Sequence, residues 1–154
     1  MLNKGGSMEN YKHILLAVDF YEHCEAVANR AKDLAVKYQA KLGIIHVVDS
    51  LPITDAGYGA DIPFNLDLTT ELMAGAKKRL SKLAEKMGVP EDRQWLEMGS
   101  PKSEIVRVAE ENKVDLIVIG SHGRHGLALL LGSTANGVLH HATCDVLAVR
   151  LQDD

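Results

Sequence analysis

The sequence has little of the features that define several classes of protein. Only two of its 154 residues are cysteines, Cys24 and Cys144, and they fall in separate predicted elements. This excludes a disulfide-stapled scaffold, and no Cys/His spacing is typical of a structural zinc site. We expect each cysteine to be a small buried apolar side chain.

Long hydrophobic runs and basic clusters are also lacking. No apolar run approaches the ~20 residues needed to span a bilayer, and no signal peptide precedes the first predicted strand. Lys and Arg number 17 against 21 Asp and Glu, a net charge of −4, and they do not cluster with aromatic residues. We therefore expect a cytoplasmic protein that binds neither nucleic acid nor membranes.

What is present fits one ordinary domain. Hydrophobic residues make up 46% of the chain and charged residues 25%, which is close to the average for a globular protein. Residues 1–10, which include Lys-Gly-Gly-Ser, are interpreted as a leader or an expression scar. Residues 11–151 are predicted to form the domain.

Strand and helix patterns alternate along this domain. We expect strands at 13–18, 41–48, 93–98, 114–119 and 145–150, separated by helices that end near 38, 87, 112 and 142. This alternation predicts a doubly wound α/β fold with a five-stranded parallel sheet, strand order 3-2-1-4-5, and two helices on each face. The long connection 49–65 is either a lid over a site or a solvated loop.

Helical periodicity predicts which side chains the first two helices bury. The buried face of the first helix is expected to contain Cys24, Val27, Ala31, Leu34, Ala35 and Tyr38. The second helix, 67–87, is expected to bury Leu68, Leu72, Ala76, Leu80, Leu83, Ala84 and Met87.

A glycine-rich stretch follows the fourth predicted strand. Gly120, Gly123 and Gly126 are equally spaced, and Gly132-Ser133-Thr134 then opens a helical pattern. Glycines let backbone N–H groups approach phosphate oxygens, and a helix N-terminus favours an anion. The stretch lacks the lysine of a Walker A loop and the G-x-G-x-x-G of a dinucleotide site. We interpret it as a different kind of nucleotide phosphate site.

Asp19 follows the first strand, and in the predicted sheet it lies across the crevice from these glycines. Its carboxylate is placed to accept hydrogen bonds from ribose hydroxyls. Asp19 and Glu22 also have capping-box spacing, so Asp19 could serve only as a helix cap. Ser133 and Thr134 could likewise be caps without a ligand.

Several motifs together resemble the universal stress protein family. They are Tyr11–Asp19, His46-Val47, Asp115–Gly123, Leu131–Ser133 and Cys144–Val149. The resemblance covers nearly all of residues 11–151. It implies a small cytoplasmic α/β protein that is generally a homodimer, and one branch of the family binds ATP or AMP.

The resemblance also implies roles for particular residues. Asp19 would contact ribose, the Val47 backbone would bond adenine, and Gly120 and Gly123 would line ribose and phosphate. The phosphates would be held by Gly132, Ser133 and Thr134. The remaining residues predicted to line the site are Ala17, Val18, Ser121 and Arg124.

The spacing departs from the family pattern in one place. Eight residues, Arg124 to Leu131, separate Gly123 from Gly132, whereas the nucleotide-binding branch usually has nine. Both ATP and AMP therefore stay as predicted ligands, with Mg²⁺ a possible companion of ATP.

Three functions from different classes follow. The favoured one is a nucleotide-binding regulatory protein; the others are a slow ATPase and a nucleotide-independent interaction module. A homodimer is expected through the last strand, an apolar sheet edge. No catalytic residue and no metal ligand is predicted.

Overall fold

The computed structural model of the protein describes residues 10–20, 24–49, 66–121 and 131–150. The elements in chain order are β1 (His13–Val18), α1 (Cys24–Tyr38), β2 (Lys41–Asp49), α2 (Leu66–Met87), the 3-10 turn η4 (Glu91–Arg93), β3 (Gln94–Gly99), α3 (Pro101–Glu111), β4 (Leu116–Gly120), α4 (Ser133–His141) and β5 (Asp145–Val149). Strands and helices alternate as predicted.

The five strands form one sheet in the order β3-β2-β1-β4-β5, and every neighbouring pair is parallel. This confirms the predicted doubly wound α/β fold. The central strands β1 and β4 are apolar on both faces because helices cover both. All six residues of β1 are buried, as are the first four of β4.

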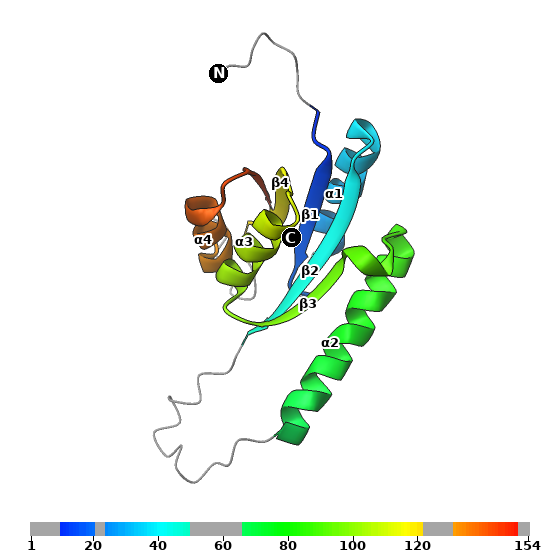
Figure 1. Cartoon of the computed structure of the whole chain (residues 1–154), viewed down its shortest axis with the longest axis vertical. Coiled ribbons are helices and arrows are strands. Elements are labelled where there is room, and N and C mark those ends of the chain that lie inside the picture. The colour runs from blue at the N-terminus through cyan, green and yellow to red at the C-terminus, as the bar shows by residue number, and fades with distance from the viewer. Residues whose placement is uncertain (1–9, 21–23, 50–65, 122–130, 151–154) are drawn as a thin grey trace.

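Alternate strand residues point into two separate cores. Ile14, Leu16 and Val18 pack under α1 and α2, whereas Leu15 and Ala17 pack under α3 and α4. The α1/α2 face and the α3/α4 face are visible on opposite sides of the sheet (Figure 1). The prediction of two helices on each face is therefore confirmed.

The buried face of α2 differs from the expected one. Ala76, Leu80, Ala84 and Met87 are buried, but Leu68 and Leu72 are 46% and 43% exposed. The first turns of α2 extend past the ends of the strands (Figure 1). Periodicity predicted which side chains share a face, whereas the sheet does not reach far enough to cover all of them.

Smaller corrections concern β3, α1 and the cysteines. The third strand begins at Gln94 rather than Arg93, because Glu91–Arg93 forms η4, and it continues to Gly99. On α1, Leu34 and Tyr38 are only half-buried. Both cysteines are free and half-buried rather than fully buried. Among the described helices, none combines the length and apolar composition needed to cross a membrane.

Candidate functional site

The carboxyl ends of β1, β2 and β4 bring most of the predicted site residues to one edge of the sheet. Ala17 pairs in register with Ile119 of β4, and Val18 pairs with His46 of β2. The residues that come directly after these paired positions therefore lie together at the carboxyl edge of the sheet. They are Asp19, Val47, Gly120 and Ser121.

The start of α4 is hydrogen-bonded to the same edge of the sheet. The backbone N–H of Gly132 donates to the carbonyl oxygen of Ser121 at 2.6 Å, and the N–H of Ser121 donates to the Val149 carbonyl at 2.8 Å. Ser133 and Thr134 begin the helix directly afterwards. The structure thus joins two segments, 120–121 and 132–134, that the sequence separates.

Gly132 is the N-cap residue of α4, and among the described residues no side-chain hydrogen bond caps the helix there. Ser133 and Thr134 occupy the first helical positions instead. The interpretation of these two residues as caps is therefore wrong. The first N–H groups of a helix have no acceptor within it, and they and the helix dipole favour an anion at this end.

Buried residues at this edge pack on the α3/α4 face of the sheet. Ala17, Val47 and Ile119 belong to the core that also contains Ala135 and Val138 of α4. Val47 is only 8% exposed, so its side chain offers almost no surface to a ligand. Asp19 is exposed, Ser133 is exposed and Thr134 is half-buried. A carboxylate, a buried strand end and a helix N-terminus therefore lie at the same edge of the sheet.

His46 and Phe20 lie beside Asp19 and were not predicted as site residues. The Nδ1 atom of His46 is 2.7 Å from the carbonyl oxygen of Val18, and because that oxygen only accepts, Nδ1 carries the proton. Burial lowers the pKa of His46, opposed by this hydrogen bond. The neutral imidazole is thus the favoured form. The sequence signal was slight: a histidine just before Val47 and a phenylalanine just after Asp19.

Two predicted site residues, Gly123 and Arg124, lie outside the described residues, as does the shortened loop that follows them. The same holds for Glu22, so the capping-box interpretation of Asp19 stays a prediction. The nine remaining predicted residues are all described: Ala17, Val18, Asp19, Val47, Gly120, Ser121, Gly132, Ser133 and Thr134.

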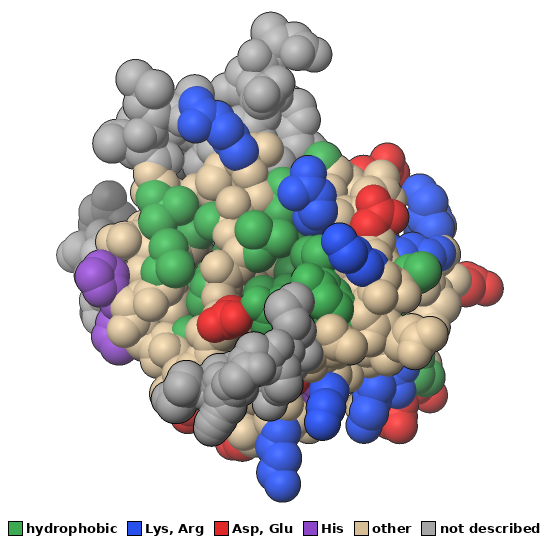
Figure 2. All heavy atoms as spheres, turned by 90° about the horizontal axis from the view of Figure 1, so that it is seen from above, with side chains coloured by type: hydrophobic (Ala, Val, Ile, Leu, Met, Phe, Trp, Pro, Cys, Tyr) green, Lys and Arg blue, Asp and Glu red, His purple; other side chains and the backbone are tan. Residues whose placement is uncertain are grey.

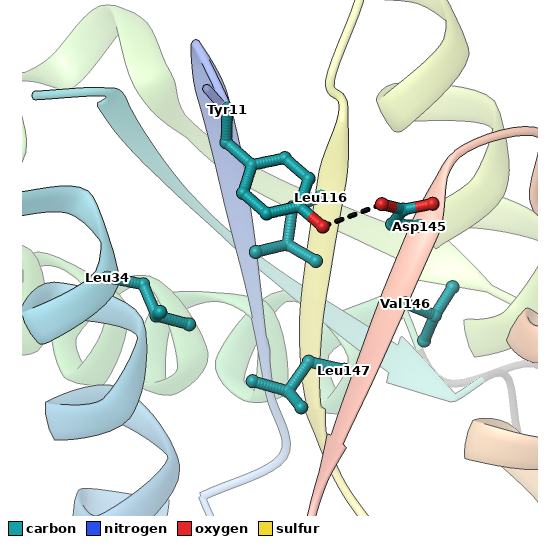
Figure 3. A pocket seen from close by; sticks show the side chains of 6 residues that line it. All are labelled: Tyr11, Leu34, Leu116, Asp145, Val146 and Leu147. Atoms are coloured by element: carbon teal, nitrogen blue, oxygen red, sulfur yellow. Dashed lines mark hydrogen bonds between the residues drawn. The ribbon is translucent and has the colours of Figure 1, made fainter. Parts of the chain in front are cut away.

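A separate groove of about 320 Å³ lies at the opposite end of the sheet, where β4 and β5 begin. The hydroxyl of Tyr11 donates to Asp145 Oδ2 at 2.6 Å there (Figure 3). Seen from the top of Figure 1, hydrophobic side chains gather in the middle of this end, with Lys and Arg side chains nearby (Figure 2). The groove is lined by Tyr11, Leu34, Leu116, Asp145, Val146 and Leu147.

Comparison with known proteins decides the family. The family model described as "Universal stress protein family" matches residues 10–150. The chain belongs to the universal stress protein family. It is 41% identical over 146 residues to "Universal stress protein A homolog 1" of Coxiella burnetii, covering 94% of this chain and 99% of that protein.

Solved structures share this architecture. Hypothetical protein MJ0577, whose biochemical function was assigned from its structure, is 27% identical with a TM-score of 0.77, over 95% of this chain and 100% of that one. A universal stress protein crystallised in complex with cAMP is 25% identical with a TM-score of 0.59, over 92% of this chain and 98% of that one. The family and the fold expected from the motifs are both confirmed.

Proposed function

We propose that this universal stress protein binds an adenine nucleotide, ATP or AMP, in the crevice at the carboxyl ends of β1 and β4, and that binding serves a regulatory role. The observation that carries the proposal is the hydrogen bond from Gly132 to Ser121. It holds the start of α4, which no side chain of the described residues caps, against the end of β4, the strand that neighbours β1.

The crevice offers different chemistry to each part of a nucleotide. The N–H groups at Ser133 and Thr134 suit phosphate oxygens, the Asp19 carboxylate can accept from ribose hydroxyls, and the Val47 backbone can bond adenine. Gly123 and Arg124 stay predictions for the phosphate side, and Mg²⁺ is expected to accompany ATP. The structural relative in complex with cAMP, itself an adenine nucleotide, supports this class of ligand.

Isothermal titration with ATP and with AMP, each with and without MgCl₂, tests the proposal. We expect saturable binding, and Asp19→Ala should weaken it about tenfold because a charged hydrogen-bond acceptor is lost. The matched control is Asp92→Ala, an exposed aspartate in η4 at the other end of the sheet. Heats that match buffer at millimolar nucleotide would refute the proposal, and phosphate release in the same samples would separate binding from slow hydrolysis.

We further propose that two copies associate through β5, the edge strand next to β4. Val146, Leu147 and Ala148 are half-buried within one chain, and Val146 and Leu147 line the open groove in Figure 3. Apolar edges of this kind are generally covered. The cytoplasmic location expected from the sequence stays a prediction.

Light scattering at micromolar concentration tests the dimer. Wild type should give the dimer mass, and Val146→Lys should shift it toward monomer because a charge would be buried at the strand edge. Val36→Lys is the control, since Val36 is 69% exposed on α1. A wild-type monomer would overturn this proposal without affecting nucleotide binding.

A further inference from the structure

Phe20, the residue after Asp19, has a backbone conformation that is unusual for a bulky side chain. Its φ is +62°, in the left-handed region that non-glycine residues mostly avoid. Such a conformation persists only when the surrounding structure enforces it, and it is found most often at functional sites. Side chains around Phe20 must therefore hold it in place.

His46 contacts the residues immediately before and after Asp19 in the sequence. Its Nδ1–H donates to the carbonyl of Val18 at 2.7 Å, and its ring meets the ring of Phe20 edge-on, with centroids 4.7 Å apart and an interplanar angle of 64°. One side chain from β2 thus fixes the residue before Asp19 by a hydrogen bond and the residue after it by ring packing.

Arg79 contacts Phe20 from α2. The carbon of its guanidinium lies 5.4 Å from the centroid of the Phe20 ring, within the range of a cation–π contact. The ring of Phe20 therefore has a partner on β2 and another on α2. Both contacts favour the left-handed turn that the backbone alone would disfavour.

Resting on the proposed nucleotide function, we propose that His46 and Phe20 are positioning residues that aim the Asp19 carboxylate at the ribose hydroxyls. A carboxylate discriminates between ribose and deoxyribose only when it is held in a fixed place relative to the sugar. Neither His46 nor Phe20 touches the nucleotide in this arrangement; each acts through the backbone on either side of Asp19.

Preference for ribose over 2′-deoxyribose is the readout, because a general loss of structure weakens both ligands equally. Calorimetric titrations compare ATP with 2′-deoxy-ATP and AMP with 2′-deoxy-AMP. Wild type should favour the ribonucleotide about tenfold, the effect of one hydrogen bond to a charged group. In His46→Leu this ratio should fall to about threefold or less, since the Val18 carbonyl loses its donor.

Two further variants keep the test decisive. His46→Asn should retain more of the ratio than His46→Leu, because its amide can donate to the same carbonyl although the ring contact with Phe20 is lost. Phe20→Gly should fold, since glycine accepts the left-handed φ, yet it should lower the ratio because the ring contacts are gone. His140→Leu, an exposed histidine of α4, is the control and should match wild type.

The outcomes distinguish the positioning role of His46 and Phe20 from the nucleotide binding on which it rests. A full ribose preference in both His46→Leu and Phe20→Gly would overturn the positioning role and leave nucleotide binding intact. Equal binding of ribo- and deoxyribonucleotides by wild type would also overturn it, because Asp19 would then not read the sugar. Failure of wild type to bind any of the four nucleotides would overturn both proposals.

Discussion

The N–H of Gly132 donates a 2.6 Å hydrogen bond to the carbonyl oxygen of Ser121, which ties the first residue before α4 to the first residue after β4. Because β4 lies next to β1, the same bond brings the start of α4 to the sheet edge where β1 ends before Asp19. The N-cap position itself has no side chain. That combination predicts that stability and the proposed nucleotide binding can be changed in opposite directions.

Gly132→Asp should stabilise the protein and weaken nucleotide binding. An aspartate at the N-cap can accept from the first helical N–H groups and favours the helix dipole, which together contribute about 0.5–1 kcal/mol. The same carboxylate would occupy and repel the phosphate position, so affinity should fall at least about tenfold. Thermal unfolding and calorimetry measure the two effects. Gly132→Ser, which caps without a charge, should lose less affinity; unchanged binding in Gly132→Asp would contradict phosphates at this helix.

Tyr11→Phe should lower stability at neutral pH by about 1 kcal/mol, the typical contribution of a hydrogen bond. The bond to Asp145, followed by burial, raises the pKa of Tyr11 to about 12 from 10.0. The protonated phenol therefore stabilises the fold fully below about pH 10, and this contribution is lost as pH rises through 12. Urea unfolding from pH 8 to 12 should show a decline that Tyr11→Phe and Asp145→Asn both reduce.

Because of His13, the free energy of unfolding should decrease as pH falls below neutral. Its side chain is 9% exposed, and its Nε2 is buried without a hydrogen-bond partner among the described residues. Burial lowers the pKa of His13, opposed by the bond to the Asn112 carbonyl; Lys41 and Arg93 lower it further and Asp115 raises it. The unfolded chain thus takes up the proton first. Stability is full above about pH 6.5 and declines as pH falls through that value toward the lower folded-state pKa.

The single tryptophan gives a direct readout of this effect. Trp95 lies with its ring centroid 6.3 Å from that of His13, and it is the only tryptophan in the chain. Urea unfolding followed by its fluorescence at pH 7 and pH 5 should show a smaller pH-dependent loss in His13→Leu. The exposed control His140→Leu should lose as much as wild type. An equal loss in His13→Leu would show that other groups, such as His46, carry the pH dependence.

Gly43→Ala should destabilise the sheet by about 1–3 kcal/mol, the usual penalty for overpacking a core. A Cβ there would lie 2.6 Å from Cζ3 of Trp95 and 3.3 Å from the backbone oxygen of Arg93. Gly75→Ala is the matched control, because a Cβ at that position of α2 meets nothing within 4 Å. The control should stabilise the helix by about 0.5–1 kcal/mol. Chemical denaturation compares them, and equal effects would refute the crowding by Trp95.

Residue patterns predicted the strand order, and with it the sheet edge that holds the candidate site, because parallel strands place their carboxyl ends at one edge. Asp19 follows the first strand and Gly120 ends the fourth, so a change of direction between those strands is enough to bring them together. The sequence predicted the ends of helices and strands, and the extent of their burial, less accurately. Arg93 resembles a strand residue but belongs to η4, and Leu72 fits the apolar face of α2 but is 43% exposed. Periodicity carries no information on how far the neighbouring element extends.

The sequence by itself determined the alternation of elements, the two buried faces of β1 and the family, because apolar periodicity and local motifs are properties of short segments. Tertiary structure alone decided that Gly132 rather than Ser133 or Thr134 occupies the N-cap position of α4, and that His46 bonds the carbonyl next to Asp19. It also decided that the backbone of Phe20 adopts a left-handed conformation. These features depend on contacts between segments far apart in the chain, where the energy of packing outweighs the preference of any single residue.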